Sequence, residues 1–297
     1  MNGRSVCLIG FGEVGQTLAR GLRTRGVALS AWDIQFPEPG SLPNHALRGS
    51  GVSAATSAAD AICGASVVVS AVTAADCLAA AETAAPLLGA GSYFLDLNSV
   101  SPATKLAAAA AIARGPGRYV EAAVMSPIQP DGACSPMLAG GPHAAAFLAL
   151  AQELGFTRMT VVSDTVGRAS ATKMCRSVMI KGVEALLTES LLAARHYGAQ
   201  DAVLESLGGL LPAKDWRALA SYMIRRSLQH GRRRAAEMRE VAQTVREAGI
   251  MPWMSEAAAE RQDWAADRRL PVAPEAILPL LDAILATIDR ETGDRAC

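Results

Sequence analysis

The sequence lacks the features of several protein classes. It has no excess of charge of either sign, since 28 Lys and Arg residues balance 28 Asp and Glu residues. This balance gives no global attraction to nucleic acid or to an anionic membrane. No apolar run reaches the roughly 18 to 20 residues that span a bilayer. No basic segment with an apolar core opens the chain, so we expect no secretory signal and a cytoplasmic protein.

Paired cysteines are also missing. The six cysteines are scattered, and none forms a C-x-x-C pair or stands in a Cys/His cluster. We therefore expect reduced thiols, with neither a disulfide framework nor a metal site. Hydrophobic residues make up 51% of the 297 residues, which is enough for a compact chain with two cores.

Short apolar segments alternate with alanine-rich helical segments up to about residue 165. The strand candidates are residues 5–9, 27–32, 66–72, 93–97, 119–125 and 158–162. Several are continuous apolar runs, which are typical of strands covered by helices on both faces. The alternation predicts an α/β Rossmann-type domain with a mainly parallel sheet over residues 1–166.

Only helical patterns follow this region. A long helix without proline is predicted over residues 169–197, ending before Gly198. Further helices are predicted over residues 200–207, 214–229, 232–248, 253–267 and 274–291, punctuated by glycine and proline. We therefore predict an all-α domain over residues 167–297, joined to the first domain by the long helix.

A glycine-rich turn, Gly10-Phe11-Gly12-Glu13-Val14-Gly15, directly follows the first strand. Gly10 permits the tight turn, Gly12 lets the backbone approach a pyrophosphate, and Gly15 lets the next helix pack closely. The first helical turn offers free N–H groups and its positive dipole end to phosphates. The setting between strand and helix predicts a dinucleotide site. The alternative is a glycine-rich turn of some other α/β protein.

An acidic residue closes the second strand. Asp33 stands roughly 20 residues after Gly10, the spacing at which an acid accepts hydrogen bonds from the adenosine ribose. A carboxylate there repels a 2′-phosphate, and no Arg or Lys follows directly. NAD is therefore favoured over NADP, although an ordinary strand-end turn also explains Asp33.

Two further strand ends carry candidates for the cofactor cleft. Ligands of doubly wound sheets bind outside the carboxyl ends of the strands. We expect Val72 and Thr73 to flank the adenosine half, and Asn98 and Ser99 to flank the nicotinamide ribose. Ordinary turn chemistry is the alternative for each of them.

With residues 10–15, residues 96–102, and Gly167 followed by Lys173, the chain resembles the β-hydroxyacid dehydrogenase superfamily. This superfamily includes 3-hydroxyisobutyrate and 6-phosphogluconate dehydrogenases. The resemblance covers nearly the whole chain, and residues 230–238 resemble a subgroup whose C-terminal helical domain has no assigned function. It implies a small anionic substrate and a homodimer formed through that helical domain.

The resemblance also implies a catalytic role for Lys173. Hydride transfer from an alcohol carbon needs a base for the hydroxyl proton, and carbonyl reduction needs an acid. A lysine serves both roles if burial and cationic neighbours lower its pKa. Ser177 stands where most relatives carry an asparagine that holds the substrate hydroxyl. Lys181, four residues further along this face, either contacts an anion or is solvated.

The substrate loop departs from the family pattern. Residues 123–130 replace the usual Ser-Gly-Gly loop, and their prolines remove backbone donors. Substrate binding must therefore differ, and Ser126 and Gln129 are the polar candidates. Ile180 stands where 6-phosphogluconate dehydrogenases carry a glutamate that assists decarboxylation, which argues against that reaction.

A basic cluster in the C-terminal region has two interpretations. His230, Arg233 and Arg234 lie close together on a predicted helix. Arginine forks suit a carboxylate or phosphate, so His230 and Arg234 are candidate substrate ligands. The alternative is a solvated, salt-bridged face, because Glu237 and further charged residues follow.

Together these features predict an NAD-dependent oxidoreductase. It would transfer hydride between nicotinamide and a 3-hydroxy acid or related polyol acid, with Lys173 as general acid and base. An imine reductase is one alternative, although these enzymes often carry Asp or Tyr in place of the lysine. A non-catalytic NAD-binding sensor is the other.

Overall fold

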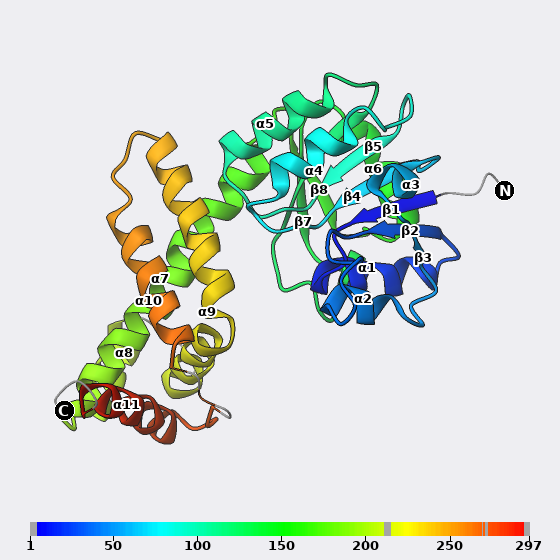
Figure 1. The fold of residues 1–297 in the computed structure, drawn as a ribbon. Helices are drawn as coiled ribbons and strands as arrows, with labels where there is room; N and C mark the ends of the chain where they lie inside the picture. The colour runs from blue at the N-terminus through cyan, green and yellow to red at the C-terminus, as the bar shows by residue number, and fades with distance from the viewer. Residues whose placement is uncertain (1–4, 211–214, 269, 271–272, 294–297) are drawn as a thin grey trace. The chain divides into compact units, whose positions relative to one another are not determined.

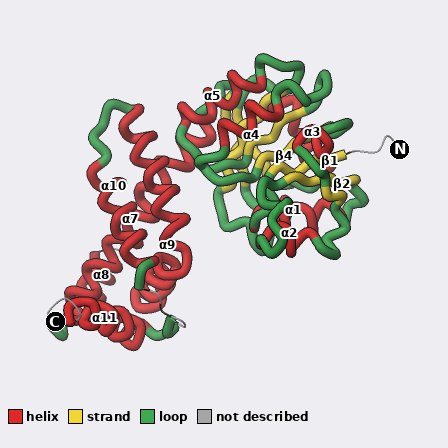
Figure 2. The backbone as a smooth tube through the Cα atoms, viewed as in Figure 1, coloured by secondary structure: helices red, strands yellow, loops and turns green. Residues whose placement is uncertain are grey.

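The computed structural model describes residues 5–210, 215–268, 270 and 273–293. Contacts between Cα atoms divide the chain into two compact units, residues 1–174 and 175–297. Among the described residues, all strands lie in the first unit, and the second is helical (Figure 2). The sequence pattern places a boundary at residue 166, whereas the contacts assign the first turns of the long helix to the first unit.

An eight-stranded sheet forms the centre of the first unit (Figure 1). Its spatial order is β3-β2-β1-β4-β5-β6-β7-β8, and every neighbouring pair is parallel except β6 and β7. The strands are β1 (Ser5–Ile9), β2 (Ala28–Trp32), β3 (Ser53–Ala54), β4 (Val67–Ser70), β5 (Tyr93–Asp96), β6 (Arg118–Val124), β7 (Met137–Gly140) and β8 (Met159–Ser163). The mainly parallel sheet predicted from the sequence is confirmed. The strands β3 and β7 were not predicted from the sequence.

Helices cover both faces of this sheet, which explains the continuous apolar strands. Along β1, Val6 and Leu8 belong to one core, and Cys7 and Ile9 belong to the other. The first core includes α1 (Glu13–Arg23) and α6 (Ala144–Leu154), and the second includes α3 (Ala58–Ile62), α4 (Cys77–Ala84) and α5 (Pro102–Ile112). The unit also contains α2 (Leu42–Leu47) and a 3₁₀ turn over Gly132–Cys134.

The strand register brings several chain segments together at one edge of the sheet, the edge formed by the carboxyl ends of the parallel strands. Ile9 pairs with Trp32 and with Ser70, and Ser70 pairs with Asp96. Because these strands are parallel, the segments that follow all four residues leave the sheet at the same edge. The glycine turn, Asp33, residues 71–73 and residues 97–101 therefore share this edge.

The second unit is built from five described helices: α7 (Arg168–His196), which begins in the first unit, α8 (Gln200–Leu210), α9 (Trp216–Glu247), α10 (Trp253–Ala266) and α11 (Ile277–Gly293). Its core includes Leu191 of α7, Ile224 of α9 and Leu280 of α11. The predicted break between residues 229 and 232 is wrong, because α9 continues through it. Gly231 serves helix packing instead, since a Cβ atom there would lie 2.3 Å from the carbonyl oxygen of Gln262 on α10. The predicted helix start at residue 214 lies outside the described residues.

Two kinds of feature are absent from the described residues. No helix there is both long and apolar enough to cross a membrane. No group of three or more His, Cys, Asp or Glu side chains in this part of the chain is placed to hold a metal ion.

Candidate active site

The turn between β1 and α1 needs glycine at two positions for packing. Gly10 has a φ of 94°, and a Cβ atom there would lie 2.4 Å from the carbonyl oxygen of Ala71. A Cβ atom on Gly15 would lie 2.2 Å from the carbonyl oxygen of Gly10. The first glycine therefore lets the turn pass the end of β4, and the second lets α1 pack on β1.

Gly12 differs because the space beside it is open. No described atom lies within 4 Å of a Cβ atom built there, although Gly12 is the N-cap of α1. Within the described structure, no side chain caps this helix by a hydrogen bond. Phe11 is buried, Val14 is half-buried and Glu13 is exposed. Open space beside the positive end of a helix fits a pyrophosphate.

The carboxylate of Asp33 lies beside this turn. Its Oδ2 atom accepts a hydrogen bond of 2.7 Å from the amide of Phe11. Its Oδ1 atom accepts one of 2.9 Å from the amide of Gln35. These bonds fix the orientation of a half-buried acidic group at the end of β2. An acid held next to the glycine turn suits the hydroxyls of an adenosine ribose.

Asn98 joins the ends of β4 and β5. Its Oδ1 atom accepts a hydrogen bond of 2.7 Å from the amide of Val72, and its Nδ2 atom donates one of 2.9 Å to Ser70 Oγ. The Thr73 hydroxyl donates to Asp76 Oδ2 at 2.5 Å. The structure places Val72, Thr73 and Asn98 at the expected edge, but the polar side chains are engaged within the protein. Asn98 therefore braces the two strand ends.

The structure brings Lys173 to Ser99. Lys173 lies in the second turn of α7, is half-buried, and donates a hydrogen bond from Nζ to Ser99 Oγ. Ser99 lies between β5 and α5, at the edge that carries the glycine turn. Two residues predicted separately, one as the proton-transfer group and one as a cofactor contact, thus meet across a long stretch of chain. Ser177 and Lys181 follow on later turns of α7 and are buried.

A buried polar network supports the segment that carries Ser99. The Asp96 carboxylate accepts from Lys105 Nζ at 2.7 Å and from the Tyr119 hydroxyl at 2.8 Å. Lys105 is fully buried, and Nζ also donates to the Asp96 carbonyl at 3.0 Å. Burial, reinforced by the Asp96 charge, raises the pKa of Tyr119 well above its usual value and that of Cys77 to about 12. Sequence analysis missed Lys105, although a lone lysine within an alanine-rich helix was an available signal.

Glu121 is a second buried charge that sequence analysis did not identify. It lies in β6 and is fully buried. Its Oε2 atom accepts a hydrogen bond of 2.7 Å from the amide of Gly167, and Oε1 accepts one of 2.7 Å from the amide of Ser170. These amides begin α7, the helix that carries Lys173. The signal in the sequence was an acidic residue inside an otherwise apolar strand.

The loop after β6 packs against α1. The Gln129 side chain donates a hydrogen bond of 3.4 Å to Thr17 Oγ1, and the Ser126 hydroxyl donates one of 3.1 Å to the carbonyl of Pro127. Ser126 is half-buried and Gln129 is exposed. The loop therefore lies close to the helix that follows the glycine turn, with Gln129 held by α1.

The basic cluster of the second unit divides into a buried part and an exposed part. Arg234 is 4% exposed and pairs with Glu184, which is 1% exposed. Burial is the largest influence on both groups: it raises the pKa of Glu184 and lowers the pKa of Arg234, against the pull of their opposite charges. Lys181 pairs with Glu237. Arg233 is exposed and His230 is half-buried. A solvated, salt-bridged face therefore describes Arg233 but not the buried Arg234.

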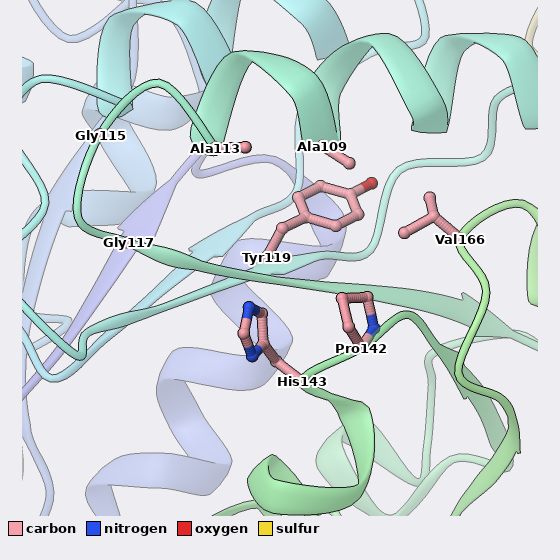
Figure 3. A pocket seen from close by; sticks show the side chains of 8 residues that line it. All are labelled: Ala109, Ala113, Gly115, Gly117, Tyr119, Pro142, His143 and Val166. Carbon is pink, nitrogen blue, oxygen red and sulfur yellow. The ribbon is translucent and has the colours of Figure 1, made fainter.

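One cavity of about 280 Å³ lies in the first unit (Figure 3). Its wall consists of Ala109, Ala113, Gly115, Gly117, Tyr119, Pro142, His143 and Val166. Tyr119 belongs to the start of β6, and Gly117 precedes this strand; the start of β6 lies at the edge of the sheet opposite to the glycine turn. Tyr119 and His143 supply the side chains with polar atoms, and the Tyr119 hydroxyl already donates to Asp96. This cavity is therefore not the cofactor cleft.

Residues 5–151 match the family model described as the NAD binding domain of 6-phosphogluconate dehydrogenase. Residues 194–265 match a domain of unknown function, DUF1932. A conserved hypothetical protein from Sinorhizobium meliloti 1021 is 37% identical, with 96% of each chain covered and a TM-score of 0.77. A second solved protein, whose structure is described as similar to 3-hydroxyacid dehydrogenases, is 36% identical over 89% of this chain and 97% of its own, with a TM-score of 0.70.

The chain belongs to the β-hydroxyacid dehydrogenase superfamily. It falls in the subgroup whose C-terminal helical domain has no assigned function. The 3-hydroxyisobutyrate dehydrogenase of Mycobacterium tuberculosis, solved with L-serine, shares the fold at 15% identity, covering 96% of this chain and 99% of its own, with a TM-score of 0.73. No curated protein sequence matches the chain significantly. As a member of this superfamily with a nicotinamide-dinucleotide domain, the chain is a dehydrogenase or reductase.

Proposed function

We propose that this protein is an NAD-dependent oxidoreductase acting on a 3-hydroxy acid or a related polyol acid. The observation that carries the proposal is the contact of Lys173 Nζ with Ser99 Oγ. It places an amine at the sheet edge that also carries the glycine turn and Asp33. A proton-transfer group at a dinucleotide-binding edge is what oxidation of an alcohol requires.

The cofactor would be held by residues of the first unit: Gly10, Phe11, Gly12, Glu13, Val14, Gly15, Asp33, Val72, Thr73, Asn98 and Ser99. When bound, the nicotinamide supplies the hydride acceptor or donor. Open space at Gly12, the N-cap residue of α1, supports the pyrophosphate position. The fixed carboxylate of Asp33 favours NAD over NADP, because it would repel a 2′-phosphate.

Lys173 would hold and move the proton of the reacting hydroxyl. As a neutral amine, Nζ accepts the proton from the alcohol, and as an ammonium it returns the proton during carbonyl reduction. The Ser99 hydroxyl orients Nζ by accepting its hydrogen bond. Ser177, one helical turn further on, would contact the same substrate hydroxyl.

Polar side chains of both units are the candidates for substrate recognition. Ser126, Gln129, Lys181, His230 and Arg234 are the candidate ligands for a small anionic substrate. Lys181 and Arg234 already pair with Glu237 and Glu184, so an anion would have to share them. We further propose a cytoplasmic homodimer formed through the helical unit, because exposed apolar side chains such as Met179 and Leu186 of α7 would then be covered.

A substrate panel tests the proposed function. Purified protein is mixed with NAD or NADP and with 2- and 3-hydroxy acids, aldonates or phosphorylated acids at alkaline pH, and reduced cofactor is followed by absorbance. We expect turnover with NAD on a 3-hydroxy acid such as 3-hydroxyisobutyrate or L-serine. Imine reductases share this fold, so cyclic imines with NADH or NADPH form the second arm. Turnover confined to imines would refute the proposal, as would cofactor binding without turnover in either arm.

A further inference from the structure

We propose that Glu121 is a positioning residue: its carboxylate fixes the first turn of α7 and thereby the place where Lys173 meets Ser99. The functional meaning of this inference rests on the proposed role of Lys173. The positioning itself can be measured without turnover.

Hydrogen bonds from the start of α7 stabilise the buried carboxylate of Glu121. The side chain is fully buried on β6, which lies between β5 and β7 inside the sheet. A carboxylate in such a place is costly unless hydrogen bonds satisfy it. Both oxygens accept bonds of 2.7 Å from amides at the amino end of α7, where the helix dipole also favours negative charge. The strand and the helix are therefore linked by a charge-assisted pair of bonds.

The surroundings of the carboxylate leave little room for movement. A Cβ atom on Gly140 of β7 would lie 2.8 Å from Glu121 Oε2 and 3.4 Å from the carbonyl oxygen of Thr165. Gly167 has a φ of 99°, and a Cβ atom there would lie 3.4 Å from Pro102 Cβ. The first turn of α7 is thus confined by β6 and β7 and by the start of α5.

The geometry connects this anchor to Lys173. From Ser170 to Lys173 the helix rises about 4.5 Å, less than one turn. Ser99, which accepts from Lys173, follows β5, and Asp96 of β5 is the register partner of Glu121 on β6. Strand β5 therefore leads to Ser99, the acceptor, and its neighbour β6 anchors α7, the helix that carries the donor Lys173. A shift of the helix start would move Nζ away from the Ser99 oxygen.

Lysine acetylation measures this directly. The full-length protein is treated with trace acetic anhydride at pH 8, and the rate of modification at Lys173 is followed by mass spectrometry. In Glu121→Gln the negative charge is lost and one amide faces an NH₂ group. In Glu121→Asp the charge stays, but the carboxylate withdraws by one methylene. We expect both variants to acetylate Lys173 about threefold faster or more, because Nζ loses its hydrogen bond to Ser99 and a bond of this kind changes the population of the free amine severalfold.

Two controls show whether a faster acetylation of Lys173 is due to the loss of the Glu121 contacts. Lys181, on the same helix, should acetylate at the same rate in all forms. Ser57→Ala removes the cap of α3, where Ser57 Oγ accepts from the Asp60 amide at 3.1 Å, and serves as a matched loss of a helix anchor elsewhere. Lys173 in this control should react as in the unsubstituted protein. If Glu121→Gln does not fold, Glu121→Asp alone carries the test.

The outcomes separate this inference from the proposed function. An unchanged Lys173 rate in a folded Glu121 variant would overturn the positioning role, as would an equal increase in Ser57→Ala. Normal turnover by Lys173→Met would instead refute the role of Lys173 and leave the acetylation result standing. With an active substrate, Glu121→Gln should lower kcat about tenfold and leave the Kd of NAD unchanged, because the helix start and the glycine turn are separate elements.

Discussion

Asp33 at the end of β2 accepts a hydrogen bond of 2.7 Å from the amide of Phe11 in the glycine turn. The contact joins the two segments that the sequence pattern assigns to the two halves of an adenosine diphosphate site. It also fixes the orientation of the Asp33 carboxylate, so this negative charge attracts or repels any ligand that binds at the glycine turn.

Replacing Asp33 should change cofactor preference. In Asp33→Ser we expect the Kd of NADH to rise about tenfold, because hydrogen bonds from the ribose to a charged group contribute about 1.5–3 kcal/mol. Binding of NADPH should improve, since the repulsive charge is gone. Fluorescence titration with both cofactors measures this. Asp60→Asn, at the exposed start of α3, is the control and should bind as before. Tighter binding of NADPH than NADH by the unsubstituted protein would contradict the NAD assignment.

Gly12 and Gly15 should respond differently to alanine. The added methyl of Gly12→Ala points into open space, so the unfolding temperature should stay nearly constant while NADH binding weakens tenfold or more. The methyl of Gly15→Ala would lie 2.2 Å from a backbone oxygen, and overpacking costs about 1–3 kcal/mol. Thermal denaturation and NADH titration of the two variants separate these effects. Equal stability losses would show that Gly12 is also a packing glycine.

Lys173→Met should bind cofactor and lose turnover. Removing a general acid and base lowers kcat about 10²- to 10⁴-fold, while the glycine turn is untouched. Arg176→Met, which removes an exposed cation from the next part of the same helix, is the matched control and should retain most activity. Steady-state kinetics on the best substrate of the panel, with NADH titration, gives the comparison. Full activity in Lys173→Met would refute the proton-transfer role.

Arg234→Met should destabilise the helical unit by about 3 kcal/mol, because it removes the closer arginine from the buried Glu184 and leaves the contact with Arg226 at 4.0 Å. The exposed Arg233→Met should change stability little. Burial raises the pKa of Glu184 and lowers the pKa of Arg234, so each charged form is disfavoured at this place. The double variant Glu184→Gln/Arg234→Met, which removes both charges, should therefore be more stable than Arg234→Met alone. Denaturant unfolding measures the three free energies. A stable Arg234→Met with a greatly raised substrate KM would instead favour a direct role in binding.

Burial should protect Cys7 and Cys77 from thiol reagents. Burial raises the pKa of each thiol from 9.0 to about 12, and only the thiolate reacts. At pH 8 the thiolate fraction falls about a thousandfold relative to an ordinary cysteine. Mass spectrometry after brief iodoacetamide treatment should find Cys63 and Cys175, both exposed, modified first. The native state holds these two protons more tightly, so this contribution to stability is complete below pH 9 and is lost between pH 9 and 12. Early modification of Cys7 would contradict the buried β1 environment.

Local pattern determined much of this protein. Continuous apolar segments, each followed by a helical one, determined the parallel sheet, because strands covered on both faces have no polar side. The glycine spacing determined the turn after β1, since Gly10 and Gly15 each face a backbone oxygen that leaves no room for a Cβ atom. Asp33 and Ser99 were predicted as cofactor contacts because each follows the end of a strand, whereas the resemblance to a family pointed to Lys173.

Tertiary structure alone decided which charged side chains are buried and which groups they contact. Glu121 and Lys105 look like ordinary residues of a strand and a helix, yet each is fully buried, and their partners lie on other elements. Arg234 looked available for a substrate, but Glu184 on another helix engages it. A break between two helices was predicted at residues 230–231, whereas α9 continues there and the close approach of α10 explains Gly231. In each case the deciding contact joins different helices or strands, and periodicity describes only the residues within one of them.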